Sequence, residues 1–153
     1  MTAIQLAGAV LAVVVVGALL PLQALVNARL GQDTSGPLFA SFVSFLVGTV
    51  LLGAAMIATR TPLPSREAIA SLPAWSWTGG VVGAVFVLTA TGLVPRLGAA
   101  ALICLAVFGQ LVGSLLLDHY GVLHAPRAAD LPRIAGAVLV AVGALLVLRP
   151  ASP

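Results

Sequence analysis

The chain has 153 residues, of which 61% are hydrophobic and 7% are charged, with a net charge of +3. Soluble domains carry about 25% charged residues, so this composition excludes an ordinary water-soluble globule, which would lack the polar surface it needs. The basic residues are all arginine and are scattered singly along the chain. This pattern argues against a nucleic-acid partner, which requires clustered positive charge. The single cysteine, Cys104, excludes an intrachain disulfide and lies in an apolar run.

Five apolar stretches dominate the chain, and each is long enough, or nearly so, to cross about 30 Å of hydrocarbon. They are residues 4–28, 37–58, 75–94, 97–117 and 131–148. We therefore predict an all-α polytopic membrane protein in contact with the lipid bilayer, with residues 1–153 forming one domain of about five transmembrane helices. The first stretch lacks the basic n-region of a secretory signal, so we expect it to be a retained helix.

Helix boundaries can be placed from turn and capping residues. Pro37 suits the first turn of the second helix, and Ser65 is expected to cap one short turn in the polar connection that follows. The stretch from 75 to 117 is about twice a membrane thickness, so we expect it to break at Pro95. Gly121 is a candidate left-handed stop for the fourth helix, and Asp130 is a candidate cap for the fifth.

The arginines divide almost evenly between the two sides of such a bundle. With five spans, one side carries Arg60, Arg66, Arg127 and Arg133, and the other carries Arg29, Arg96 and Arg149. Orientation follows the arginine and lysine bias of short loops, and a difference of one residue is close to none. We favour dual insertion, which allows an antiparallel homodimer of the inverted-repeat type that many secondary transporters use. The alternative is a single orientation set by other signals.

Polar side chains within apolar spans are expensive in lipid and are therefore candidates for function. Those within the spans fall on shared helix faces, because residues three or four apart are neighbours on a helix. They are Gln23 with Asn27, Ser41 with Ser44, and Gln110 with Ser114 and, at the end of the span, Asp118. Thr89 and Thr91 lie in the later half of the third span. For the amides, a substrate pathway and plain interhelical hydrogen bonding are comparably good explanations; for the serines, hydrogen bonding between helices is the simpler one.

Two arginines lie directly at span ends. Arg29 follows the first span and Arg96 precedes the fourth, on the same side of a five-span bundle. Together they would face an anionic group at the mouth of a pathway, although interfacial snorkelling also explains them.

No motif for catalysis is present: there is no HExxH, GxSxG, P-loop or CxxC pattern. His119 and His124 lie outside the spans, without partners at a matching depth. We therefore expect no enzyme activity, no catalytic residue, no cofactor and no metal site.

Several strings resemble the YdcZ-type branch of the drug/metabolite transporter superfamily. They are Pro21-Leu-Gln-Ala-Leu-Val-Asn27-Ala-Arg29-Leu-Gly31, Ser44-Phe-Leu-Val-Gly48-Thr, Gly79-Gly80 with Gly83, Val94-Pro-Arg-Leu-Gly98-Ala, Gly109-Gln110, and Asp118-His119-Tyr120-Gly121. The spacing of Gly136 and Gly143 is similar to the closing helix of the superfamily's five-helix repeat. The resemblance covers essentially the whole chain.

The resemblance implies a five-helix half-transporter of a bacterial inner membrane, an exporter of unknown substrate that pairs with a second copy or an inverted paralogue. The small multidrug resistance relatives carry a membrane-embedded acid in their first helix, whereas this helix has Gln23 and Asn27 and no acid. A proton-exchanging glutamate and a specificity for cationic drugs are therefore not carried over.

Three functions remain open from the sequence. The first is a dimeric transporter for a small polar or amphipathic metabolite, with a pathway formed by Gln23, Asn27, Arg29, Ser44, Arg96, Gln110, Ser114 and Asp118. The second is an ion or small-solute channel lined by the same polar faces. The third is a membrane scaffold that transports nothing.

Dual insertion can be tested with a topology reporter fused to the C-terminus. One arginine added to either side should shift the reporter towards the side that the positive-inside rule favours. A reporter that stays wholly on one side before and after both changes would contradict dual insertion.

Overall fold

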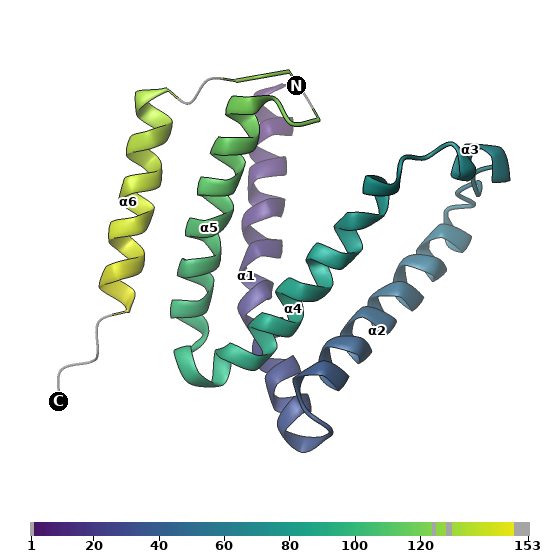
Figure 1. Cartoon of the computed structure of the whole chain (residues 1–153), viewed down its shortest axis with the longest axis horizontal. Coiled ribbons are helices and arrows are strands. Elements are labelled where there is room, and N and C mark those ends of the chain that lie inside the picture. The colour runs from purple at the N-terminus through teal and green to yellow at the C-terminus, as the bar shows by residue number, and fades with distance from the viewer. Residues whose placement is uncertain (1, 124, 128–129, 149–153) are drawn as a thin grey trace. The chain divides into compact units, whose positions relative to one another are not determined.

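The computed structural model describes residues 2–123, 125–127 and 130–148, and within these residues the regular structure is entirely helical. The elements are α1 (Ala3–Asp33), α2 (Pro37–Ala58), α3 (Arg66–Ala70), the 3-10 helix η1 (Ala74–Trp77), α4 (Thr78–Leu97), α5 (Ala99–Tyr120) and α6 (Leu131–Val147), shown in Figure 1. The predicted all-α class is confirmed. His124 and Arg149, which the sequence analysis discussed, lie outside the described residues.

Four helices in the described part of the chain are long and apolar enough to cross a bilayer: α1, α2, η1 together with α4, and α5. Helix α6 is apolar but has only 17 residues. At 1.5 Å per residue it extends about 26 Å, the short end of the spanning range. The fifth predicted span is therefore the shortest of the set.

The chain forms two compact units, residues 1–95 and 96–153, and the boundary between them lies in the last turn of α4. Unit 1 contains α1 to α4 up to Pro95, and unit 2 contains α5 and α6. The expectation that all five spans form one domain stays a prediction.

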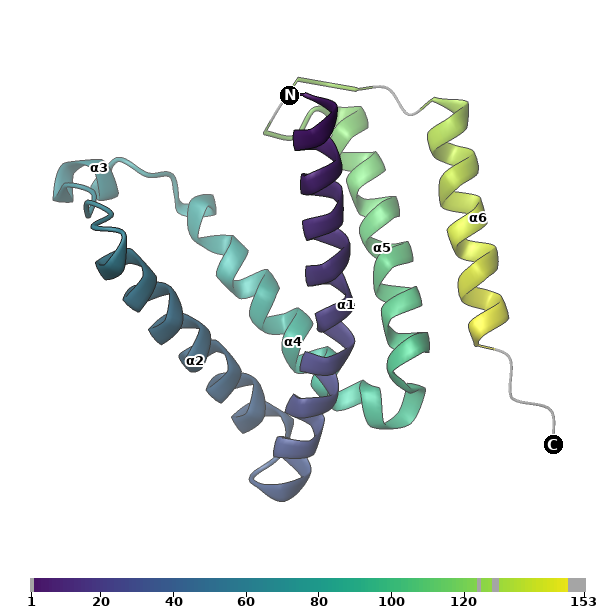
Figure 2. The same ribbon diagram turned by 180° about the vertical axis from the view of Figure 1, so that it is seen from behind.

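In unit 1, α1 and α2 are joined by a short turn and diverge away from it, as Figures 1 and 2 both show. Gly36 has a φ of 103°, which favours glycine, and its amide N–H donates to the carbonyl of Gly31 over 3.1 Å. Pro37 then occupies the first turn of α2, as the sequence predicts. Beyond the turn, every residue of α1 from 2 to 20 is exposed.

Two glycines of α4 lie beside residues of α2. A Cβ on Gly92 would lie 3.9 Å from Pro37 Cγ, and one on Gly83 would lie 3.4 Å from Phe45 Cζ. The two helices are thus antiparallel, with Gly92 beside the start of α2 and Gly83 two turns further along. A Cβ on Gly31 of α1 would also meet Pro37, at 3.3 Å from its nitrogen. The helices α1, α2 and α4 therefore approach one another at Pro37.

Helix α1 is longer than predicted, because it continues from 28 through Gly31 to Asp33. An ion pair between Arg29 Nε and Asp33 Oδ2, 2.9 Å apart and four residues apart in sequence, supports the added turn. The turn between α1 and α2 is therefore confined to residues 34–36.

The break between α4 and α5 also differs from the prediction, which placed it at Pro95. Pro95 lies inside α4, and the helix ends only at Leu97. The interruption is at Gly98, whose φ of 77° is readily adopted by glycine alone. A proline in the last turn loses one helical hydrogen bond but does not force the chain to change direction.

The predicted helix caps are confirmed. Ser65 accepts a hydrogen bond from the amide of Ala68 at the start of α3, and Asp130 accepts one from the amide of Arg133 at the start of α6, each at 3.1 Å. Gly121 ends α5 in the left-handed conformation, with φ 64° and ψ 39°.

Replacing Gly121 with alanine should destabilise unit 2. The new Cβ would lie 2.6 Å from Pro126 Cγ, and the left-handed backbone penalises an L-residue. We expect the free energy of unfolding to fall by about 1–3 kcal/mol, measured by denaturant unfolding in micelles. Gly109→Ala is the control, because a Cβ on Gly109 meets nothing within 4 Å. Equal effects of the two substitutions would contradict this account.

Candidate functional site

One face of α1 is buried where this helix meets α2. Its residues fall at i, i+3, i+4 and i+7: Ala24, Asn27, Ala28 and Gly31. On α2, Ala40 is fully buried. In lipid there is little hydrophobic drive between helices, so small side chains that permit close backbone approach hold such a pair together. The only large polar side chain on this face of α1 is the amide of Asn27.

Gln23 and Ser44 are brought together across α1 and α2. The Gln23 Nε2 atom donates to Ser44 Oγ over 3.4 Å, which is a long hydrogen bond. Gln23 is exposed and Ser44 is half-buried. A hydrogen bond of this kind within a bilayer contributes about 1 kcal/mol or less to stability. The pair therefore stabilises the contact between α1 and α2 only weakly.

Two buried polar atoms in unit 1 have no hydrogen-bond partner: the amide nitrogen Nδ2 of Asn27 and the hydroxyl Oγ1 of Thr91. The two residues are 5% and 2% exposed. An unsatisfied buried polar group lowers the free energy of unfolding by about 1–3 kcal/mol. A contribution to stability therefore does not explain the polar side chains at these two positions. Ser41, the other buried polar residue in this unit, donates its hydroxyl to the Pro37 carbonyl over 2.8 Å.

The hydroxyl of Thr91 lacks the bond to its own helix that several hydroxyls of α2 make. Ser41, Thr49 and Thr59 each donate to the carbonyl one turn earlier, over 2.8 Å, which is how hydroxyls in helices are usually satisfied. Thr91 makes no such bond. In addition, Pro95 stands four residues later and has no N–H to donate to the Thr91 carbonyl. The Thr91 hydroxyl thus has no partner, and the Thr91 carbonyl lacks its usual donor four residues later.

A pocket of about 430 Å³ lies between α2 and α4. Its walls are apolar except for one hydroxyl side chain, and the lining residues are Leu38, Ser41, Phe42, Phe45, Ala84, Val85 and Leu88. Leu88 is one turn before Thr91 along α4. The pocket therefore opens between the same two helices that carry Ser41 and Thr91.

Unit 2 has a polar site of a different kind, where α5 ends and α6 begins. Arg133 Nη1 lies 3.6 Å from Asp118 Oδ2, and Arg133 Nε lies 3.9 Å from Asp130 Oδ1. The Asp118 carbonyl accepts the amide N–H of Arg127 over 2.7 Å. A pocket of about 410 Å³ between α5 and α6 has Ser114, Asp118 and Arg133 in its lining. Asp118 thus ties the ends of the two helices together.

The remaining predicted site residues belong to both units. Gln110 and Ser114 are exposed on α5, and the Ser114 hydroxyl donates to the Leu111 carbonyl over 3.0 Å. Arg29 is paired with Asp33, and Arg96 is exposed in the last turn of α4. Arg29 and Arg96 belong to different units, so their joint action on an anionic group stays a prediction.

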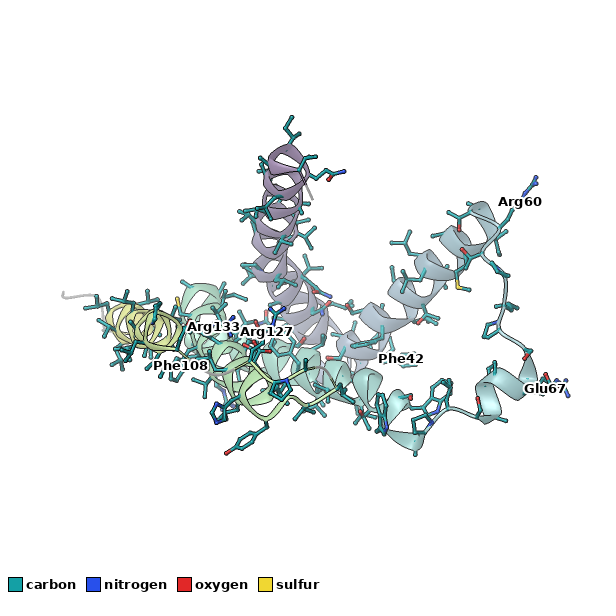
Figure 3. All side chains as sticks on the ribbon, turned by 90° about the horizontal axis from the view of Figure 1, so that it is seen from above. Phe42, Arg60, Glu67, Phe108, Arg127 and Arg133 are labelled. Atoms are coloured by element: carbon teal, nitrogen blue, oxygen red, sulfur yellow. The ribbon has the colours of Figure 1, made fainter. Side chains whose placement is uncertain are left out.

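The charged residues Arg60 and Glu67 lie in the connection between α2 and α4, far along the chain from Asn27 and Thr91. Figure 3 shows Arg60 and Glu67 extending outward from the connection between α2 and α4. Among residues 2–123, 125–127 and 130–148, no group of three or more histidine, cysteine or acidic side chains could hold a metal ion.

Two features escaped the sequence analysis. Thr91 was noted only as a polar residue late in its span, although Pro95 four residues later was a readable signal of an unsatisfied carbonyl. The pairing of Arg133 with Asp118 joins α5 to α6. No pattern in the local sequence predicts this ion pair.

Apolar helices, small-residue contacts and a few polar groups inside the spans define a polytopic membrane protein. The sequence matches a family profile described as "Putative inner membrane exporter, YdcZ" over residues 8–146. It is also 33% identical over 121 residues to "Inner membrane protein YdcZ" of Escherichia coli (strain K12), an alignment that covers 79% of this chain and 81% of that protein. The chain belongs to the YdcZ family of inner-membrane proteins. No solved structure matches it.

These matches confirm the predicted family and the inner-membrane location. They also support a transporter-like role for the chain, in agreement with the first of the three functions left open by the sequence.

A double-mutant cycle can measure how strongly Asp118 and Arg133 couple. Both side chains are about one third exposed, so we expect a coupling of about 0.2–1 kcal/mol between Asp118→Asn and Arg133→Gln in micelle unfolding. Asp33→Asn combined with Arg133→Gln is the control, because Asp33 pairs with Arg29 and not with Arg133. Strictly additive effects of the first pair would show that the contact contributes nothing.

Proposed function

We propose that this chain moves a small polar or weakly amphipathic metabolite across the inner membrane, and that two copies of opposite orientation form the working transporter. It has no enzymatic role in this proposal. The observation that carries it is the position of Gln110, supported by the family's description as an exporter.

Gln110 lies in the middle of α5, a 22-residue apolar helix, and it is exposed. Its amide makes no side-chain hydrogen bond with another described residue. An amide facing hydrocarbon without partners is costly. A water-filled pathway, or polar groups from a second copy, would satisfy it, and both are present in a transporter assembled from two chains.

The surface of α1 supports the second copy. Residues 2–20 are exposed on all sides, so about half of this helix packs against nothing in its own unit. The four-to-three division of arginines permits either orientation. Oppositely oriented copies would bring Gln23, Asn27 and Gln110 of each chain around an axis in the membrane plane.

The proposal predicts that Gln23→Ala, Asn27→Ala and Gln110→Ala leave dimer assembly intact and lower transport. Loss of one hydrogen bond to the solute at the rate-limiting step should reduce flux up to about tenfold. A thermal-shift screen of a metabolite and cation panel would identify a ligand, and its flux would then be measured in proteoliposomes. Thr49→Val is the control, since that hydroxyl is exposed and bonded to its own helix at Phe45.

The same assay separates the alternatives. Flux that saturates with solute indicates a transporter, whereas ohmic conductance indicates a channel. Flux in the wild type with no change in all three alanine variants would remove these residues from the pathway. No flux of any ligand that shifts the melting temperature would favour a scaffold.

A further inference from the structure

The unsatisfied groups of Asn27 and Thr91 lie at nearly the same level of unit 1. Asn27 is one turn before Gly31, and Thr91 is adjacent to Gly92. A Cβ on either glycine would meet Pro37. Both polar residues are therefore within one helical turn of the point where α1, α2 and α4 converge, although they are 64 positions apart in the sequence.

The buried polar side chains at this level are uncharged. Asn27 offers an amide N–H donor, and Thr91 offers a hydroxyl that can donate or accept. Pro95 also removes the usual helical donor to the Thr91 carbonyl. The nearest charged side chain along α1, Arg29, is exposed and paired with Asp33. A buried ion without a compensating charge is far more costly than a buried neutral group. The position therefore disfavours cations and anions and suits the oxygen of a neutral solute.

Resting on the proposed function, we infer that Asn27 and Thr91 form the recognition centre for an uncharged solute that carries hydroxyl or carbonyl groups. Such an oxygen accepts from Asn27 Nδ2, and a solute hydroxyl donates to the oxygens at Thr91. The pocket between α2 and α4, with Ser41 as its hydroxyl-bearing wall, gives the solute a path between the helices. Thr91 becomes a specificity-determining residue that the sequence did not single out.

The test compares Thr91→Val with Thr89→Val. Both substitutions exchange a hydroxyl for a methyl group on α4, but Thr89 is exposed whereas Thr91 is 2% exposed. Full-length protein is reconstituted in proteoliposomes, and uptake of xylitol, glucose and N-acetylglucosamine is compared with uptake of tetraphenylphosphonium and of benzenesulfonate. The melting temperature of each variant is measured in micelles without solute.

We expect uptake of at least one neutral probe by the wild type, and its loss by about tenfold or more in Thr91→Val, with little change in Thr89→Val. Because valine removes an unpartnered buried hydroxyl, the melting temperature of Thr91→Val should rise by about 2–4 °C. A residue that only joined helices would give a lower melting temperature and unchanged uptake. Asn27→Leu should likewise lose uptake of the neutral probe and raise the melting temperature. This second variant still tests the inference if Thr91→Val folds poorly.

Other outcomes are equally decisive. Uptake of the cation or the anion alone would overturn the neutral specificity while leaving the transport proposal standing. Neutral uptake that is unchanged in both Thr91→Val and Asn27→Leu would remove this recognition centre. Absence of uptake for every probe, with conductance also absent, would overturn the proposed function along with the inference that rests on it.

Discussion

The structure of unit 1 depends on the close approach of three helices at Pro37. Gly31 and Gly92 allow the backbones of α1 and α4 to reach the proline ring, and any side chain on Gly31 would press on backbone atoms 3.2–3.3 Å away. Within a bilayer the hydrophobic effect does not drive helices together, so van der Waals contact through small residues replaces it. Away from Pro37 the helices diverge, and their surfaces are left to lipid, to a second copy, or to a solute.

Unit 1 is therefore tightly packed near Pro37 and loosely packed further along its helices. Near Pro37 the residues Ala28, Ala40 and Val94 are almost completely buried. One or two turns further along, the contacts consist of a long Gln23–Ser44 hydrogen bond and an apolar pocket between α2 and α4. Helices that are fixed at one end and weakly joined elsewhere can tilt about the fixed end. Alternating access requires relative movement of this kind.

The polar groups are of two kinds. Some stabilise the structure by pairing with each other, and others have hydrogen-bonding atoms that a ligand could satisfy. In unit 2, Asp118 and Arg133 satisfy each other near the helix ends, where water is within reach and the energetic gain is modest. In unit 1, the unpartnered atoms of Asn27 and Thr91 lower stability within the apolar region. Natural sequences tolerate such losses mainly at functional sites.

The sequence by itself determined the class of protein, because a chain this apolar can satisfy its backbone in lipid only as helices. It also predicted the local devices that act within a few residues: Pro37 at a helix start, the caps at Ser65 and Asp130, and the left-handed stop at Gly121. The break near Pro95 was misplaced by a few residues, since a proline marks a weakened helix but only the φ of Gly98 turns the chain. Which polar residues are buried, which are paired and which lack partners was decided by the tertiary structure alone. Gln23 and Asn27 share a face in sequence, yet one is exposed and the other is buried, because burial depends on where another helix crosses that face.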